Sequence, residues 1–241
     1  MALFECGFLA GGPDDQGKSN QIFNATLVPV RSTSTTLSVP FQGGWAFALA
    51  ANADGDLYSW GVNHMTVRGK KSTPVEIEEG SDPNVPHLVT KNATAVGVGF
   101  DFAVVITPGG VLGLGPPFGS TEADKPLSLA PISVPQRVRC AAGGERHALL
   151  LGESGAVWML GKHETFSAAG NPPNSLIKYT GALTFGEPCK VVDGNCTAVA
   201  AGARHSLVVQ ADGGLLAWGC NVHGQAGSGA EGGEVAAPKL V

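Results

Sequence analysis

The chain repeats one short pattern four times, and this repetition constrains its fold more than any other feature. The clearest copies are AGARHSLVVQADGGLLAWGCNVHGQAG at 201–227 and AGGERHALLLGESGAVWMLG at 142–161, and weaker copies lie at 43–61 and 99–115. Their opening glycines recur at intervals of 55, 45 and 58 residues. Periods of this scale are typical of solenoids and propellers, whose units bury their apolar faces against one another. The opening glycines are Gly44, Gly99, Gly144 and Gly202.

Each copy has the pattern of a β-hairpin. The apolar run 148–151 is followed by a turn at Ser154-Gly155, and a second apolar run then ends in Leu-Gly. Two short apolar runs joined by a glycine-containing turn predict a hairpin. A proline-containing segment precedes each hairpin, and proline is tolerated at strand starts and on edges. We therefore expect outer strands around four prolines, which are Pro29, Pro74, Pro135 and Pro188.

The composition agrees with a fold made of short strands. The 241 residues include 35 glycines and 16 prolines, which mark turns, and no window shows a sustained helical period. We expect one all-β domain over 1–241, a β-propeller of about four full repeats plus a composite or partial blade. The expected repeats are roughly 25–61, 74–115, 135–161 and 188–227, with terminal strands at 3–7 and 237–241.

The final copy carries a more specific pattern, G-x-x-H-[ST]-L followed by D-G and W-G-x-N-x-x-G-Q. This pattern resembles the repeat of the regulator of chromosome condensation family, and the resemblance extends over nearly the whole chain. It implies a propeller, which in that family has seven blades and a longer chain. Here 3–7 resembles the last strand of a repeat and 237–241 the first. Two closures stay open: the termini share one blade, or an open arc is completed by a partner. The matching residues are Gly202, His205, Ser206, Leu207, Asp212, Gly213, Trp218, Gly219, Asn221, Gly224 and Gln225.

The repeated histidines are expected to be structural. His147 and His205 occupy the same slot, which Phe47 and Phe102 fill in the other two copies. A general base is needed once, whereas a packing residue recurs in every blade. A buried aromatic-like residue is therefore the favoured interpretation, and no catalytic residue is expected. The same interpretation applies to Trp60, Trp158, Trp218 and the adjoining Gly219 as residues of blade packing.

A match to the phosphate-binding loop lies near the N-terminus. Residues 12–19, GPDDQGKS, fit G-x-x-x-x-G-K-[ST]. Such a loop cradles phosphate with backbone N–H groups and a following helix. Pro13 has no N–H, Asp14 and Asp15 repel phosphate, and the next segment is β-branched rather than helical. We interpret the match as accidental and expect no nucleotide or other cofactor.

Charge and cysteine content exclude other classes of site. The formal net charge is −5 and only 15 residues are lysine or arginine, which disfavours direct nucleic-acid binding. The five cysteines have no CxxC spacing, so neither a zinc site nor a disulfide framework is expected. No apolar run is long enough for a membrane span, and the N-terminal residues do not fit a secretory signal. A cytoplasmic or nuclear protein is expected.

Function is expected in the loops between blades, because loops on a rigid scaffold carry binding residues. The favoured function is a protein-interaction scaffold or regulatory subunit without chemistry of its own, working on a partner protein or in a multi-subunit complex. The family resemblance implies an alternative, a guanine-nucleotide exchange factor for a small GTPase. Two segments combine apolar and polar residues as binding hot spots do. Their candidate residues are Phe166, Leu176, Ile177 and Tyr179 in 162–180, and His64, Met65 and Arg68 in 62–72.

Overall fold

The described part of the chain consists of β-strands and turns. The computed structural model describes residues 3–7, 22–28, 41–43, 47–52, 54–61, 65–67, 70–72, 86–100, 102–115, 117–118, 129–161, 185–229 and 233–241. Four sheets have four antiparallel strands each, and two further sheets are pairs of strands. These residues confirm an all-β fold. None of them forms a helix that is long and apolar enough to cross a membrane.

The four large sheets follow one another along the chain. The first contains β3 (Phe41–Gly43), β4 (Phe47–Ala51), β5 (Leu57–Gly61) and β8 (His87–Thr90). The second contains β9 (Ala95–Val98), β10 (Ala103–Thr107), β11 (Gly110–Leu114) and β12 (Ala130–Ile132). The third contains β13 (Val138–Gly143), β14 (His147–Gly152), β15 (Val157–Gly161) and β16 (Cys189–Val192). The fourth contains β17 (Cys196–Ala201), β18 (His205–Gln210), β19 (Leu215–Cys220) and β20 (Glu234–Leu240). The two pairs are β1 (Leu3–Gly7) with β2 (Ile22–Val28), and β6 (Met65–Val67) with β7 (Lys70–Ser72).

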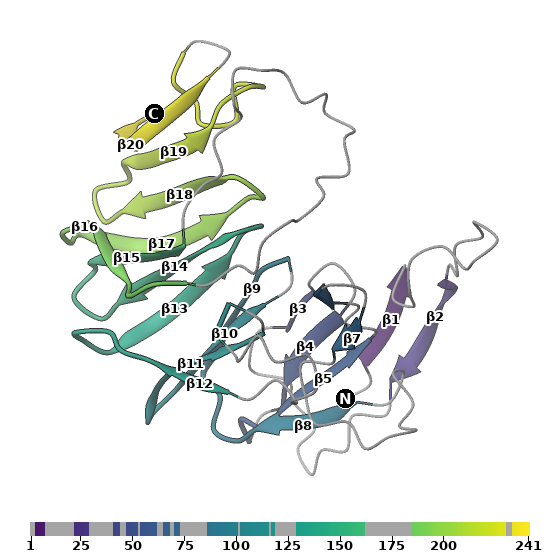
Figure 1. The fold of residues 1–241 in the computed structure, drawn as a ribbon. Helices are drawn as coiled ribbons and strands as arrows, with labels where there is room; N and C mark the ends of the chain where they lie inside the picture. The colour runs from purple at the N-terminus through teal and green to yellow at the C-terminus, as the bar shows by residue number, and fades with distance from the viewer. Residues whose placement is uncertain are drawn as a thin grey trace.

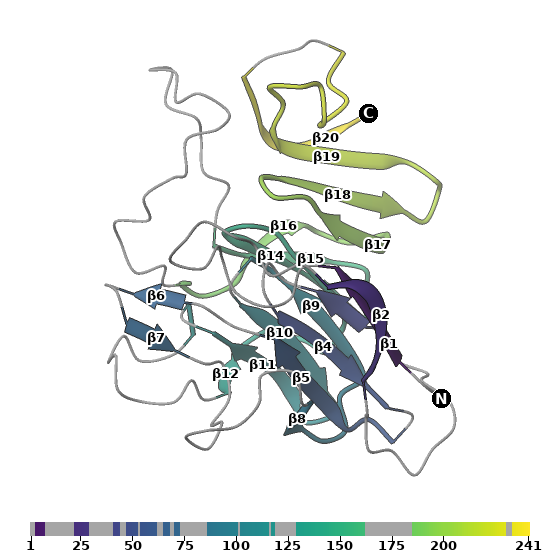
Figure 2. The ribbon, with the colours of Figure 1, turned by 90° about the vertical axis from the view of Figure 1, so that its right-hand side faces the viewer.

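The sheets are arranged as blades of a partial propeller. In Figure 1 they succeed one another along an arc that ends at the C-terminal sheet, and Figure 2 shows the same succession after a quarter turn. Strands β9 and β10 pack against β13, and β13 and β14 pack against β17. Four full blades and the partial blade β1–β2 agree with the predicted β-propeller.

Each expected hairpin turn closes through a glycine with positive φ. Gly155 has φ 82° and donates its N–H to the Gly152 carbonyl, and Gly213 has φ 89° and donates to the Gln210 carbonyl. Glycine adopts this conformation without the steric cost that a side chain incurs. Gly219, at the end of β19, has φ 100° and is buried, so the glycine of the Trp-Gly pair is needed for its backbone.

The outer strands differ from the sequence-based expectation in their connectivity. The segment after Pro188 forms β16, which pairs with β15, so the outer strand belongs to the preceding hairpin. Strand β20 likewise pairs with β19 and completes the fourth sheet. The expected opening strand at 237–241 is therefore the outer strand of a finished blade, and β1 pairs with β2 rather than with the C-terminal strand. How the ends of the arc are completed therefore stays a prediction.

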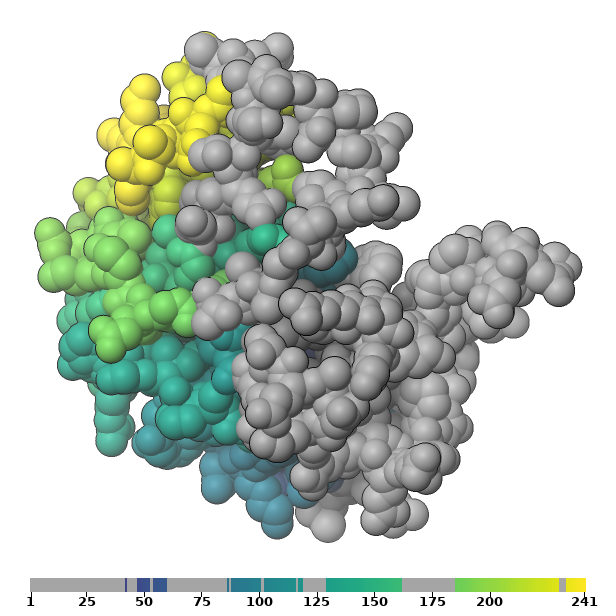
Figure 3. Space-filling model, in the orientation of Figure 1, coloured from purple at the N-terminus to yellow at the C-terminus, as the bar shows by residue number. Residues whose placement is uncertain are grey.

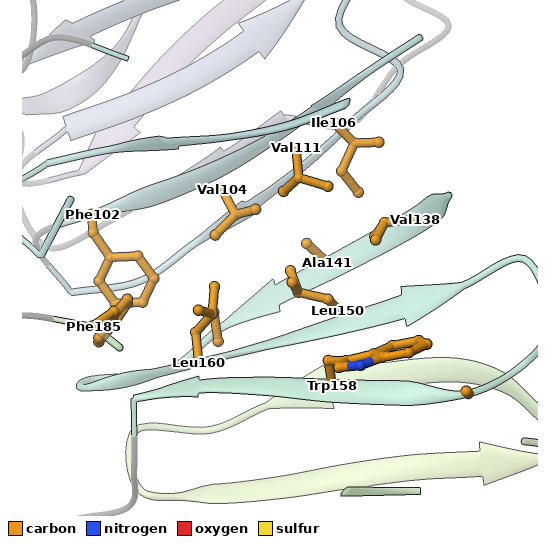
Figure 4. Close-up of a cluster of buried hydrophobic side chains, with 12 residues drawn as sticks. Phe102, Val104, Ile106, Val111, Val138, Ala141, Leu150, Trp158, Leu160 and Phe185 are labelled. Atoms are coloured by element: carbon orange, nitrogen blue, oxygen red, sulfur yellow. The ribbon is translucent and has the colours of Figure 1, made fainter. Parts of the chain in front are cut away.

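The core lies between consecutive sheets rather than inside any one of them. Side chains of β10 and β11 interlock with those of β13, β14 and β15 in the cluster drawn in Figure 4. A second cluster joins the first and second sheets, and a third joins the third and fourth. Burial of apolar area between neighbours therefore stabilises the stack, as expected for a repeat protein.

Candidate functional site

In each of the four described large sheets, the third and fourth strands are joined by a long connection whose two ends lie at the same rim of the stack. These connections are residues 62–86, 115–129, 162–188 and 221–233, and each leaves its sheet at the same end of an equivalent strand. The short turns before β10, β14 and β18 lie at the same end, because Ala103 pairs with Leu114, His147 with Gly161 and His205 with Gly219. We call this edge the loop rim. The opposite edge, with the tight hairpin turns near Gly155 and Gly213, is the turn rim.

The glycine and the aromatic-like residue of the repeat lie against each other on the loop rim. A Cβ atom on Gly144 would lie 2.2 Å from Cε1 of His147, and one on Gly202 would lie 2.0 Å from Cε1 of His205. A Cβ on Gly99 would similarly lie 2.2 Å from the Phe102 ring. The ring therefore covers the glycine, so the G-x-x-H spacing is a packing requirement that phenylalanine also meets.

Three polar contacts join the third and fourth blades beside these rings. His147 is fully buried, and its Nε2 lies 3.0 Å from Oγ of Ser206 in the next blade. Arg204 donates from Nε to Oε2 of Glu145 over 2.7 Å, with only 17% and 14% of their side chains exposed. The Glu145 N–H also donates to the Ala203 carbonyl. A buried histidine engaged between blades favours a structural role over that of a base that must reach substrate.

An aromatic cluster fixes the bases of two long connections. The Phe185 ring centroid lies 4.9 Å from that of Phe102 and 5.1 Å from that of Phe118, both edge-on. The Phe185 N–H also donates to the Pro117 carbonyl. Phe118 belongs to 115–129 and Phe185 to 162–188, so connections from neighbouring blades share one anchor at the end of the cluster in Figure 4.

The connection 221–229 shows how the last part of the repeat motif builds a loop. Asn221 is buried, its Oδ1 accepts from the Ala226 N–H, and its Nδ2 donates to Oγ of Ser228. Gln225 donates from Nε2 to the Cys220 sulfur and accepts from the His223 N–H. The N-x-x-G-Q spacing thus cross-links the loop. Val222 remains 38% exposed and His223 is exposed, so both side chains face solvent.

Three titratable side chains of the described residues have pKa values shifted by burial toward their neutral forms. Burial raises the pKa of the Cys140 thiol and of the Cys196 thiol, so both stay protonated at neutral pH. Burial lowers the pKa of His205, which keeps that ring neutral. Within the described ranges there is no group of three or more His, Cys, Asp or Glu residues that could hold a metal ion.

Most of the expected partner-binding residues lie outside the described residues. Met65 lies in β6, and the others are His64, Arg68, Phe166, Leu176, Ile177 and Tyr179. The phosphate-loop match at 12–19 and the repeat glycine Gly44 also lie outside them. The two candidate segments belong to equivalent connections, 62–86 and 162–188, and the described strands that flank these connections end at the same rim. The sequence did not predict that these two connections begin and end at one edge.

Sequence reasoning missed the residues that organise this rim. Glu145 lies one position after the opening glycine of its repeat, whereas Arg204 lies two positions after the opening glycine of the next repeat. Aligning the repeats with one another therefore does not pair these two residues, which contact each other in the structure. Phe118 and Phe185 lie in connections outside the repeat pattern. Val222 and His223 occupy the two x positions of the N-x-x-G-Q motif, between Asn221 and Gly224. The motif does not specify the residues at these positions, and this was the signal in the sequence that their side chains point outward.

These features can be compared with those of known proteins. Residues 196–225 match the family model described as the regulator of chromosome condensation (RCC1) repeat. The chain is 24% identical to the RCC1 domain-containing protein RUG3, mitochondrial, of Arabidopsis thaliana, over 90% of this chain and 49% of that protein. It is 33% identical to the mouse secretion-regulating guanine nucleotide exchange factor, over 55% of this chain and 30% of that protein.

A solved structure shows the same fold. Yeast RCC1 (Prp20), crystallised with Kap60, superposes with a TM-score of 0.68 at 22% identity, covering 94% of this chain and 53% of that one. A separate crystal structure of Prp20p from Saccharomyces cerevisiae was described with its binding properties to Gsp1p and histones. The chain spans about half the length of RUG3 and of this propeller, so the activities of the whole relatives are not carried over by similarity alone.

Proposed function

We propose that this chain, which is similar to RCC1-repeat propellers, is a protein-interaction subunit that binds a partner protein through its loop rim. The observation that carries this proposal is that four long connections begin and end at one rim of blades that are joined by buried contacts. A rigid base lowers the entropy lost when loops bind, because the loop ends are already positioned.

The proposed partner surface includes the exposed residues of 221–229 and the apolar residues of 62–72 and 162–180. Val222 and His223 supply an exposed apolar side chain beside an imidazole. Tyr179 and Phe166 add aromatic residues of the type that dominates binding energy at interfaces. No intrinsic chemistry is proposed, and the cytoplasm or the nucleus is the proposed compartment.

Affinity purification with matched rim variants tests this proposal. The pair Val222→Asp and His223→Ala changes the loop rim, and Glu153→Lys changes an exposed residue on the turn rim. We expect the loop-rim change to reduce recovery of specific partners at least about tenfold, while Glu153→Lys leaves it unchanged. Equal recovery by both variants, with Tyr179→Ala also silent, would show that partners bind elsewhere.

A guanine-nucleotide exchange factor is the alternative function, since one relative carries that name. It is tested by release of a fluorescent guanine nucleotide from purified small GTPases, with Gsp1 in the panel because Prp20p was studied with it. A scaffold binds without accelerating release. Acceleration by about tenfold or more, lost in the Val222→Asp and His223→Ala variant, would favour exchange activity on the same rim.

A further inference from the structure

The second and third sheets meet on the loop rim through aromatic rings, whereas the third and fourth sheets meet there through polar groups. Phe102 fills the repeat slot of the second sheet, and its ring centroid lies 6.0 Å from that of Phe118 and 4.9 Å from that of Phe185. The slot residue of the third sheet is His147, which contacts Ser206 of the next sheet. The two slot residues therefore differ in what they hold, because Phe102 contacts two rings that belong to long connections.

Two rings of this aromatic cluster lie over glycines of the sheets. A Cβ atom on Gly113 would lie 2.3 Å from Cγ of Phe118, and one on Gly161 would lie 2.6 Å from Cε1 of Phe185. Gly113 belongs to β11 of the second sheet and Gly161 ends β15 of the third. Because protein interiors are closely packed, a side chain at either glycine would displace the ring above it. The two sheets thus determine where both rings lie.

The two rings come from different connections. Phe118 lies near the start of 115–129, and Phe185 lies near the end of 162–188. Their ring centroids are 5.1 Å apart in an edge-on arrangement, and the Phe185 N–H donates to the Pro117 carbonyl over 3.2 Å. The end of one connection is therefore fixed to the beginning of the other through both a side chain and the backbone.

Burial gives this contact its strength. Phe185 is only 9% exposed and Phe118 is half-buried. Aromatic rings packed edge-on attract each other beyond the burial of their area, so loss of the Phe118 ring weakens the hold on Phe185 without any change in the third sheet. A connection whose end is already fixed loses less entropy when it binds a partner. The cluster therefore prepares 162–188 for binding.

We propose that Phe118 is a positioning residue for the connection 162–188, and that through Phe185 it couples two connections of neighbouring blades into one binding unit. This inference rests on the proposed function, in which 162–180 supplies partner-binding residues. Figure 4 shows Phe102 and Phe185 in contact at one end of the apolar cluster, and Figure 3 shows the second and third sheets, blue to teal, packed directly against each other. A change in the connection of one blade therefore affects the connection of the next.

Limited proteolysis of the full chain tests this coupling. Trypsin cleaves after Lys178 inside the connection and after the exposed Lys91 between the first and second sheets. In Phe118→Ala we expect cleavage after Lys178 to be about tenfold faster than in wild type and cleavage after Lys91 to change less than about twofold, because the opening is local. Ile132→Ala is the matched control. Ile132 is also half-buried against the same core cluster, but it lies toward the turn rim, so both rates should stay unchanged.

Two results overturn the proposal. Equal acceleration after Lys91 and Lys178 would show a general loss of stability, and an unchanged rate after Lys178 would show that Phe118 does not hold the connection. Circular dichroism establishes that Phe118→Ala is folded. If it is not, Phe118→Leu carries the same comparison, since it keeps an apolar side chain without the ring, and its rate after Lys178 should be intermediate.

Recovery of partner proteins by affinity purification separates this inference from the proposed function. Phe118→Ala should reduce recovery by at least about threefold, although Phe118 lies outside the candidate binding segments, because the binding connection is less well positioned. Faster cleavage after Lys178 with unchanged recovery would support the positioning role of Phe118 and contradict the use of 162–180 in partner binding.

Discussion

The third and fourth sheets have nearly the same sequence pattern but differ in what covers them. Both contain a Gly-x-x-His turn, an apolar β-hairpin and a glycine of positive φ at the tight turn. Every residue of β14 is buried, whereas β18 alternates between buried and more exposed positions. The comparison teaches that a blade of this type is completed by its successor, because half of its apolar residues face the next sheet rather than its own.

Truncation of equivalent leucines gives the largest expected contrast. Leu149→Ala leaves a cavity between two sheets and should lower the free energy of unfolding by about 2–5 kcal/mol. Leu207→Ala, at the same repeat position, should cost less than about 1 kcal/mol because that side chain keeps contact with water. Urea denaturation at low protein concentration measures both. Equal losses would mean that Leu207 is as buried in solution as Leu149.

Loss of the ion pair between Glu145 and Arg204 gives the next largest expected effect on stability. Glu145→Leu leaves Arg204 without the carboxylate that it contacts in a largely buried position, and should cost about 1–3 kcal/mol. The exposed pair of Lys190 and Asp193 is the matched control, and Asp193→Asn should leave the melting temperature essentially unchanged because solvent screens this pair. Thermal melting of both variants measures the two effects. A larger drop in melting temperature for Asp193→Asn than for Glu145→Leu would contradict the prediction.

Alanine substitutions at the two turn glycines separate the cost of backbone strain from the cost of steric crowding. Both Gly155 and Gly213 have positive φ, so alanine at either should cost about 1 kcal/mol from strain. Gly155→Ala should cost about 1 kcal/mol more, because its Cβ would meet the Cys196 backbone. Chemical denaturation of the two single variants gives the difference directly. If both cost the same, the fourth blade does not differ from the third along its turn.

The smallest effect is a pH dependence from His205. Burial lowers the pKa of this ring in the folded state, so the unfolded chain binds the proton more readily. The stability that His205 contributes is fully present above its unfolded pKa and is lost as the pH falls through the lower folded value. Melting temperatures of wild type and His205→Gln should therefore converge or cross as the pH falls from 7.5 toward 5. Parallel curves would show that the imidazole titrates alike in both states.

Much of the fold follows from local patterns. The hairpins of the third and fourth sheets were predictable because alternating apolar runs and Gly-containing turns act within a few residues. The positive φ of Gly219 and the packing of the repeated histidine slot follow from the same local pattern. The partners of the outer strands were not predictable in this way, because a proline-containing strand can pair with the hairpin before it or after it, and only the register of β16 and β20 decides.

The sequence by itself determined that this protein is an all-β repeat propeller, since its period, turn glycines and aromatic slots are local requirements of each blade. Only the tertiary structure decided which residues meet between blades. The contacts of Glu145 with Arg204 and of Phe118 with Phe185 join residues about sixty positions apart, at offsets that no single repeat encodes. The exposure of Val209 has the same origin, because burial depends on whether another sheet lies opposite, and that is a property of the assembled stack.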